Sequence, residues 1–171
     1  MSTTPEKLMD LAEAHIRQGG YGGFSFRDLA AELGIKSASV HHHFPTKPQM
    51  AAAVARRYCE RFLEAVAPRS DTERDDPISI YRTAFREGIE RDGKMCLFGV
   101  LGAEMGALPP EVVTEIHAFF RLCIDDLTRR IGGPEAQTLA FEVMATLEGG
   151  VILARAYDSI EPFDQAAASL A

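Results

Sequence analysis

The feature that most restricts the fold is a pair of short helical patterns separated by a single glycine, Gly34. Residues 27–44 read RDLAAELGIKSASVHHHF. Leu29 and Leu33 are four residues apart and share one face of a helix, and a glycine can adopt the left-handed conformation that a tight turn requires. The spacing fits a helix-turn-helix, in which the start of the second helix can enter the major groove of DNA. Two short helices joined by glycine can also form a simple helical hairpin, so both interpretations stay open.

Apolar residues before and after this motif can complete a small helical head. Leu8, Leu11 and Ile16 follow helical spacing and can cover the open side of the two short helices. Phe24, Phe26 and Phe44 supply bulk. The head is therefore expected to contain three helices before a long fourth one, and the expected N-caps are Thr4, Ser25, Ser37 and Thr46.

The second short helix carries a polar outer face. Serine and histidine side chains can hydrogen-bond base edges or phosphate oxygens, and lysine supplies positive charge. Lys47 lies at the start of the following helix, whose N-terminal amides favour a phosphate. The candidate DNA-binding residues are Arg27, Lys36, Ser37, Ala38, Ser39, His41, His42, Thr46 and Lys47.

Three consecutive histidines invite a comparison with metal sites. Successive helical residues point about 100° apart, so they cannot converge on one ion. We expect no metal to bind at this run. We expect His43 to pack inward while His41 and His42 face the groove or the solvent.

The charge of the chain is unevenly distributed. The net charge is −7, but residues 1–67 carry 8 basic and 7 acidic side chains, and residues 68–171 carry 10 basic and 18 acidic ones. A neutral to basic N-terminal third on an acidic body is consistent with a nucleic-acid-binding module attached to another domain.

The rest of the chain also has helical periodicity. Helices are expected near 77–92, 96–106, 110–131 and 135–157, with a short tail near 161–170, and no useful alternating β pattern is present. The polar, proline-bracketed stretch at 68–77 is a candidate boundary. The fold class is therefore predicted to be all-α, with a helix-turn-helix domain at 1–50 and a helical domain at 51–171.

The run YGGFSFRDLAAELGIKSASVHHHFPTKPQM resembles the DNA-binding domain of the TetR family of transcriptional regulators. The resemblance includes the glycine- and aromatic-rich approach, the R-D-L-A-x-x-L-G-I helix, the Ser-led recognition helix ending in H-F, and the following lysine. Where many members carry Tyr before the H-F pair, this chain has His41 and His42. The resemblance implies a DNA-binding head followed by a helical domain that binds a small molecule and forms a homodimer.

The segment at 135–157 is the candidate dimer helix. It is apolar on most faces and contains Gly149 and Gly150, and small residues let two helices approach closely. Together with 110–131 it can form a four-helix interface, although a helix buried within one protomer has the same composition. The candidate interface residues are Phe119, Leu122, Leu147, Gly149, Gly150 and Leu153.

The segment at 94–120 is the candidate sensing region. It offers apolar side chains that can line a pocket, and Glu104 and His117 are polar groups that can orient a ligand. Ordinary core packing at helical spacing explains the apolar members equally well. The candidate ligand-binding residues are Phe85, Cys96, Phe98, Leu101, Glu104, Met105, His117, Phe120 and Met144.

Cys96 carries a separate hypothesis. It follows Lys94 and lies near an expected helix N-terminus, and both features favour a reactive thiol. Some members of the resembling family respond to oxidants or electrophiles, so Cys96 is either a sensor thiol or a packed apolar cysteine.

Several classes of protein are excluded by pattern. Three dispersed cysteines form neither a disulfide framework nor a zinc motif, and no nucleophile elbow or phosphate-binding glycine loop is present. We expect no enzyme activity, no cofactor, no signal peptide and no membrane span, and hence a cytoplasmic protein. The predicted function is a homodimeric repressor that binds a palindromic DNA operator and is released by a small molecule or a reactive species. The alternative is a helical ligand-binding or protein-interaction module that does not bind DNA.

Overall fold

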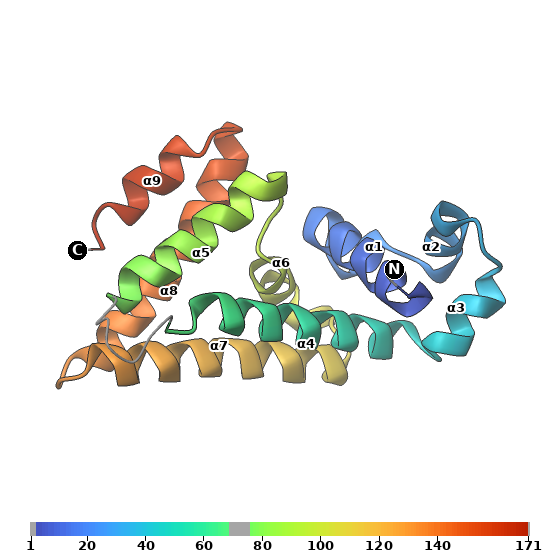
Figure 1. Ribbon diagram of the computed structural model, residues 1–171, viewed down its shortest axis with the longest axis horizontal. Helices are drawn as coiled ribbons and strands as arrows, with labels where there is room; N and C mark the ends of the chain where they lie inside the picture. The colour runs from blue at the N-terminus through green and yellow to red at the C-terminus, as the bar shows by residue number, and fades with distance from the viewer. Residues whose placement is uncertain (1–2, 69–75, 171) are drawn as a thin grey trace. The chain divides into compact units, whose positions relative to one another are not determined.

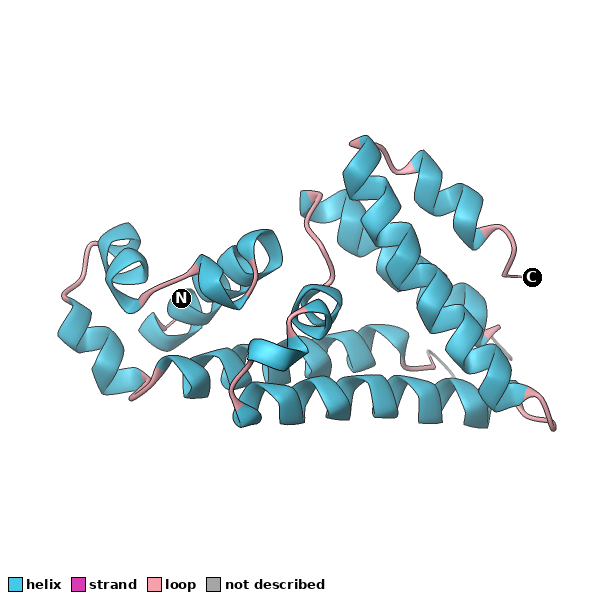
Figure 2. Ribbon diagram, turned by 180° about the vertical axis from the view of Figure 1, so that it is seen from behind, coloured by secondary structure: helices cyan, strands magenta, loops and turns pink. Residues whose placement is uncertain are grey.

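Helices make up all the regular secondary structure of the described part of the chain, residues 3–68 and 76–170, in a computed structural model (Figure 1, Figure 2). The all-α prediction is confirmed. The elements in chain order are α1 (Thr4–Gly19), η1 (Tyr21–Gly23), α2 (Phe26–Leu33), α3 (Ser37–His43), α4 (Lys47–Val66), α5 (Pro77–Asp92), α6 (Leu97–Ala103), η2 (Met105–Ala107), α7 (Pro110–Ile131), α8 (Ala136–Tyr157) and α9 (Glu161–Ala167).

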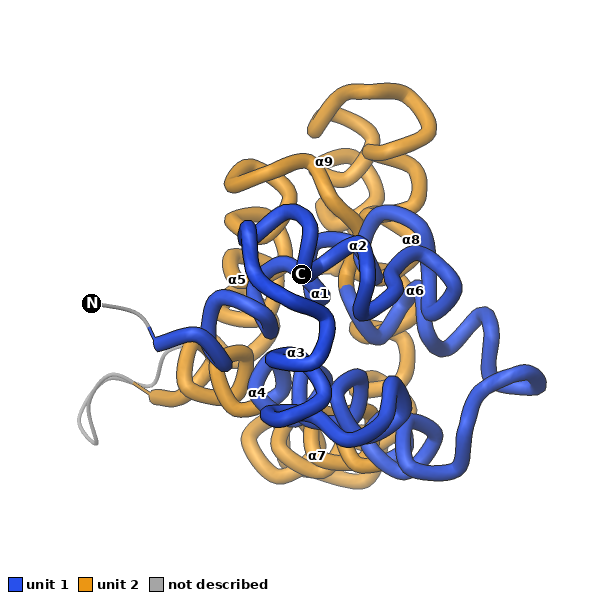
Figure 3. The backbone as a smooth tube through the Cα atoms, turned by 90° about the vertical axis from the view of Figure 1, so that its right-hand side faces the viewer, with its two compact units in different colours: residues 1–59, 97–117 blue, residues 60–96, 118–171 orange. Residues whose placement is uncertain are grey.

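The chain forms two compact units, coloured separately in Figure 3. The first contains residues 1–59 and 97–117, and the second contains residues 60–96 and 118–171. Contacts rather than function define these units, so the predicted functional boundary at residue 50 stays a prediction. Most of the candidate boundary at 68–77, residues 69–75, lies outside the described residues.

The first unit is built around the apolar faces of its first helices. Leu8 and Ile16 of α1, Leu29 of α2 and Val40 of α3 are completely buried. Arg57 of α4 adds an ion pair to Asp10 of α1, with 2.8 Å between Nη2 and Oδ1. Helix α1 packs against α2, as predicted, and α2 packs against α3.

Helix starts follow local capping rules, with two corrections to the expected N-caps. The N-cap of α1 is Thr3 rather than Thr4, because Thr3 forms a reciprocal capping box with Glu6. The N-cap of α3 is Lys36 rather than Ser37, and no side chain caps that helix. Ser25 and Thr46 act as predicted, since their hydroxyl oxygens accept hydrogen bonds from the amides of Asp28 and Gln49.

In the second unit α5, α8 and α9 pack against one another, and α5 also meets the C-terminal parts of α4 and α7 in an aromatic cluster. The ring of Phe62 makes edge-on contacts with Tyr81, Phe85 and Phe119, with centroids 5.3–5.7 Å apart. Gly150 of α8 allows a close approach of Phe163 from α9, because a Cβ at Gly150 would lie 2.8 Å from the ring.

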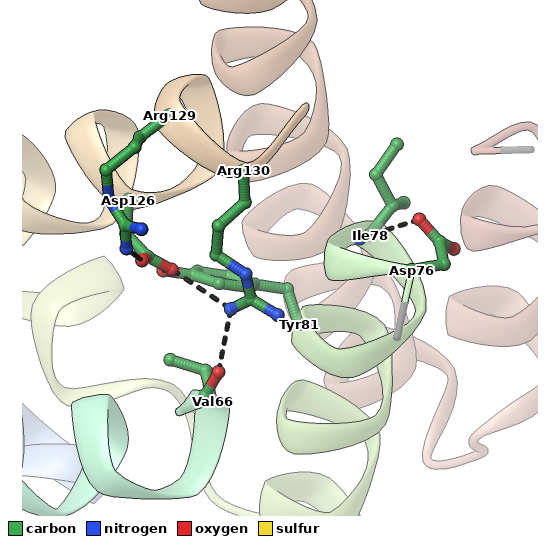
Figure 4. A network of polar contacts seen from close by, with 7 residues as sticks. All are labelled: Val66, Asp76, Ile78, Tyr81, Asp126, Arg129 and Arg130. Atoms are coloured by element: carbon green, nitrogen blue, oxygen red, sulfur yellow. Dashed lines mark hydrogen bonds and ion pairs between the residues drawn. The ribbon is translucent and has the colours of Figure 1, made fainter. Parts of the chain in front are cut away.

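A polar network closes one end of this unit (Figure 4). The Tyr81 hydroxyl donates to Asp126 at 3.1 Å, and Arg130 donates to both Asp126 and the carbonyl oxygen of Val66. Burial, followed by the neighbouring Cys123 and Asp126, raises the pKa of Tyr81 well above its ordinary value. Tyr81 therefore stays a neutral donor, and the network joins α5 and α7 to the end of α4.

Candidate nucleic-acid interface

The turn between α2 and α3 has the geometry that its sequence predicts. Gly34 adopts the left-handed conformation, with φ 66° and ψ 30°. The amide of Ile35 then donates to the carbonyl oxygen of Ala30 at 2.9 Å, and the amide of Gly34 donates to that of Ala31 at 3.2 Å. Ala30 is itself buried, which lets the following chain pass close to the helix.

The outer face of α3 is open to solvent. The side chains of Lys36, Ser37, Ala38, His41 and His42 are exposed, and Ser39 is half-buried. Val40 alone on this helix is fully buried, so it anchors α3 to the head while the polar face points away. The candidate DNA-binding residues of α3 thus share one accessible surface.

The histidine run departs in one respect from the sequence expectation. His43 is exposed rather than packed inward. It is His41 that rests against the head, with its ring 4.8 Å from the ring of Phe26 in an edge-on contact. Among the described residues, no group of three or more histidine, cysteine, aspartate or glutamate side chains is arranged to hold a metal ion.

The candidate phosphate ligands beside α3 differ in their surroundings. Arg27 is almost fully exposed, next to Asp28. Lys47, in contrast, is half-buried: its Nζ donates to the carbonyl oxygen of Phe24 at 2.7 Å and lies 4.6 Å from the centroids of the Tyr21 and Phe24 rings. Burial lowers the pKa of Lys47, and the charge of Glu104 partly offsets this.

The candidate ligand-binding residues divide between the two units. Phe98, Leu101, Glu104, Met105 and His117 belong to the first unit, whereas Phe85, Cys96, Phe120 and Met144 belong to the second. Phe85, Cys96, Phe98, Leu101 and Met144 are buried, and His117 is exposed. Glu104 lines an open hollow beside Tyr21 and Leu108.

Glu148 is a buried acid that the sequence reasoning missed. Its two carboxylate oxygens are shut off from solvent, and the Cys96 thiol lies close enough to act on the carboxyl. Burial raises the pKa of the Glu148 carboxyl to about 7, while the bond from Cys96 opposes part of the rise. A single acid in the apolar run TLEGGVILA was the available signal.

The surroundings of Cys96 bear on the sensor hypothesis. Its side chain is buried beside the carboxylate of Glu148, and the nearby Lys94 pairs with Asp92 at 3.6 Å. The basic neighbour that favoured a reactive thiol is therefore engaged elsewhere. The sensor role stays a hypothesis.

The candidate dimer residues divide into buried and exposed members. Phe119, Leu147 and Gly150 are buried within the protomer, whereas Leu122 and Leu153 are exposed. Gly149 has no atom within 4 Å of the place that a Cβ would take. The sequence reasoning missed three other large apolar side chains that α8 exposes to solvent, Phe141, Ile152 and Tyr157.

Comparisons with known proteins agree with this geometry. Residues 8–54 match the family model described as bacterial regulatory proteins, tetR family. A TetR transcriptional regulator from Legionella pneumophila is 28% identical, with a TM-score of 0.92 over 99% of this chain and 96% of that one. A TetR-family transcriptional regulator from Agrobacterium tumefaciens is 26% identical, with a TM-score of 0.90 over 97% of this chain and 94% of that one. A search of the curated proteins found no match. Within residues 3–68 and 76–170, no helix is both long and apolar enough to span a lipid bilayer.

Proposed function

We propose that this chain, which belongs to the TetR family of transcriptional regulators, is a homodimeric repressor that binds a palindromic DNA operator and is released by an effector. It is a DNA-binding regulator and not an enzyme. We propose that it represses transcription, forms a dimer, binds a symmetric operator and responds to an effector. A cytoplasmic location follows from DNA as the partner and stays a prediction.

The observation that carries the proposal is the open polar face of α3. Val40 holds the helix to the head from the inner side, and the residues from Lys36 to His42 on the outer side include serine, lysine and histidine side chains that can reach base edges. We assign base contacts to Ser37, Ala38, Ser39, His41 and His42. We assign phosphate contacts to Arg27, Lys36, Thr46 and Lys47.

An exposed apolar surface on α7 and α8 supports the homodimer. It consists of Leu122, Phe141, Ile152, Leu153 and Tyr157, which are 43%, 58%, 54%, 43% and 72% exposed. Several large apolar side chains exposed on two helices of one unit favour an interface, and Gly149 leaves room for a partner helix. Two recognition helices about 34–36 Å apart can read successive major grooves, which gives a dimer its specificity.

The division of roles follows from this arrangement. Residues 1–50 are proposed to bind DNA, and residues 51–171 are proposed to dimerise and to bind the effector. An effector acts as a releasing ligand only if it binds the DNA-incompetent arrangement more tightly. The buried side chains around Phe85, Cys96 and Met144 in the second unit are the candidate lining.

Selection of a duplex from a random DNA pool by the purified full chain tests DNA recognition. We expect a palindromic consensus whose affinity falls steeply as salt rises. Lys47→Ala should weaken binding to all sequences. It should also reduce the slope of log binding constant against log salt concentration by about one. Ser39→Ala should instead change the ranking of operator variants. An unchanged slope for Lys47→Ala would limit Lys47 to its internal contact with Phe24, and failure to select any duplex would refute the proposed function.

Sedimentation tests the dimer. Ile152→Glu places a charge in the exposed apolar surface, so we expect it to convert a dimer to monomers. Thr83→Glu, at an exposed position of α5, is the matched control and should remain dimeric. A monomeric wild type, or a dimer unaffected by Ile152→Glu, would contradict the assigned interface.

A further inference from the structure

Glu104 connects two segments of the first unit that are far apart in sequence. It lies between α6 and η2, and its Oε2 accepts a hydrogen bond from the backbone amide of Tyr21 at 2.8 Å. Tyr21 belongs to η1, the turn between α1 and α2. The carboxylate therefore contacts the chain just before the helix-turn-helix begins.

The backbone around Tyr21 is shaped to admit this carboxylate. A Cβ at Gly20 would lie 1.9 Å from Glu104 Oε1, and the φ of Gly20 is +73°. The backbone conformation favours glycine at this position, and a side chain there would displace the Glu104 carboxylate. The close approach of Glu104 is thus built into the Gly20–Tyr21 turn.

The segment that Glu104 holds also anchors Lys47. Phe24, three residues after Tyr21, offers its carbonyl oxygen to the Lys47 ammonium at 2.7 Å, and both aromatic rings lie under that ammonium at 4.6 Å. Ser25 then caps α2. One short stretch, residues 20–25, therefore connects Glu104 to the start of α2 and to the start of α4.

We propose that Glu104 is a positioning residue for DNA binding, which holds residues 20–25 in the arrangement that presents α3 and Lys47 to DNA. The proposal rests on the proposed function. Glu104 is only half-buried and lines an open hollow, so its bond to the Tyr21 amide is exchangeable rather than locked in a core.

Two substitutions separate the hydrogen bond from the charge. Glu104→Ala removes the acceptor, whereas Glu104→Gln keeps an oxygen that can accept from the Tyr21 amide. Glu111→Ala is the matched control, since Glu111 is an exposed acid whose charge also acts on Tyr21. The full-length variants are titrated with the duplex that the wild type selects from the random pool, at several salt concentrations.

We expect Glu104→Ala to bind this duplex about tenfold more weakly, as when the competent arrangement falls to a tenth of the population. Glu104→Gln and Glu111→Ala should stay within about twofold of the wild type, since neither removes the acceptor. The salt slope should not change, because Glu104 contacts no phosphate. Hydrogen exchange without DNA should be faster at the Tyr21 amide in Glu104→Ala, while amides of α8 keep their protection, which a general loss of stability would not allow.

Unchanged affinity of Glu104→Ala on a duplex that the wild type binds would overturn this inference alone. So would equal losses in Glu104→Ala and Glu104→Gln, or an unchanged exchange rate at Tyr21. A wild type that selects no duplex overturns the proposed function and this inference together.

Discussion

Glu148→Gln tests whether a buried acid in α8 makes the stability of this protein depend on pH. The carboxyl has a pKa of about 7 in the folded chain, against 4.5 for an ordinary glutamate. Below pH 4.5 both the folded and the unfolded states hold the proton. Between pH 4.5 and 7 the unfolded chain releases it while the folded chain keeps it, so the free energy of unfolding falls as pH rises.

The magnitude follows from the difference between these two pKa values. Each pH unit between them corresponds to about 1.4 kcal/mol, so ionisation of Glu148 reduces the free energy of unfolding by about 3 kcal/mol at pH 8. Glutamine has nearly the same shape and cannot ionise. We therefore expect Glu148→Gln to approach the stability of the wild type near pH 5 and to exceed it by up to about 3 kcal/mol at pH 8.

Denaturant unfolding at a series of pH values between 5 and 8 measures this difference. Protein concentration must be held constant, because the proposed dimerisation would also stabilise the folded state. Glu142→Gln is the matched control, as Glu142 is an exposed glutamate on the same helix. The two stability curves of wild type and Glu148→Gln should diverge as pH rises; parallel curves would refute the buried, ionisable role of Glu148.

Two further changes test the packing of α8 and the capping of α2. Gly150→Ala should lower the free energy of unfolding, measured with denaturant, by about 1–3 kcal/mol, because its Cβ would press on the buried ring of Phe163. Phe163→Leu in the same background should recover part of this loss. An unchanged free energy of unfolding in Gly150→Ala would contradict the close contact. Ser25→Ala should cost about 1 kcal/mol through the lost bond to the Asp28 amide. Ser37→Ala should cost less, since Ser37 caps no helix, and equal thermal shifts for the two variants would contradict the observed N-caps.

Local rules made much of the DNA-binding head predictable. The Leu29 and Leu33 spacing, the conformation of Gly34 and the caps at Ser25 and Thr46 depend on residues within four positions of one another. Two predicted N-caps were wrong by one residue: α1 begins after Thr3 rather than Thr4, and α3 begins after Lys36 rather than Ser37. At α1 two adjacent threonines can both cap the helix, whereas at α3 no side chain caps it, and the backbone geometry decides where each helix begins.

The candidate sensing and dimer regions were less predictable for a different reason. α8 is apolar on most faces, so its pattern predicts that the helix is covered. The pattern does not show whether the cover is the chain's own helices or a partner. Leu147 is buried by its own chain, while Leu153 is exposed. The same uncertainty hid Glu148, whose burial depends on the neighbours that the fold brings to it.

The amino-acid sequence alone predicted the helices, the helix-turn-helix and the polar face of its second helix, because these depend on contacts between residues close in sequence. Folding in three dimensions decided that Glu104 meets the Tyr21 amide, that Lys47 turns toward Phe24, and which apolar side chains of α8 stay exposed. Those features depend on residues distant in sequence. Hydrophobic periodicity predicts which residues share a face of a helix, but it does not predict which residues pack against that face.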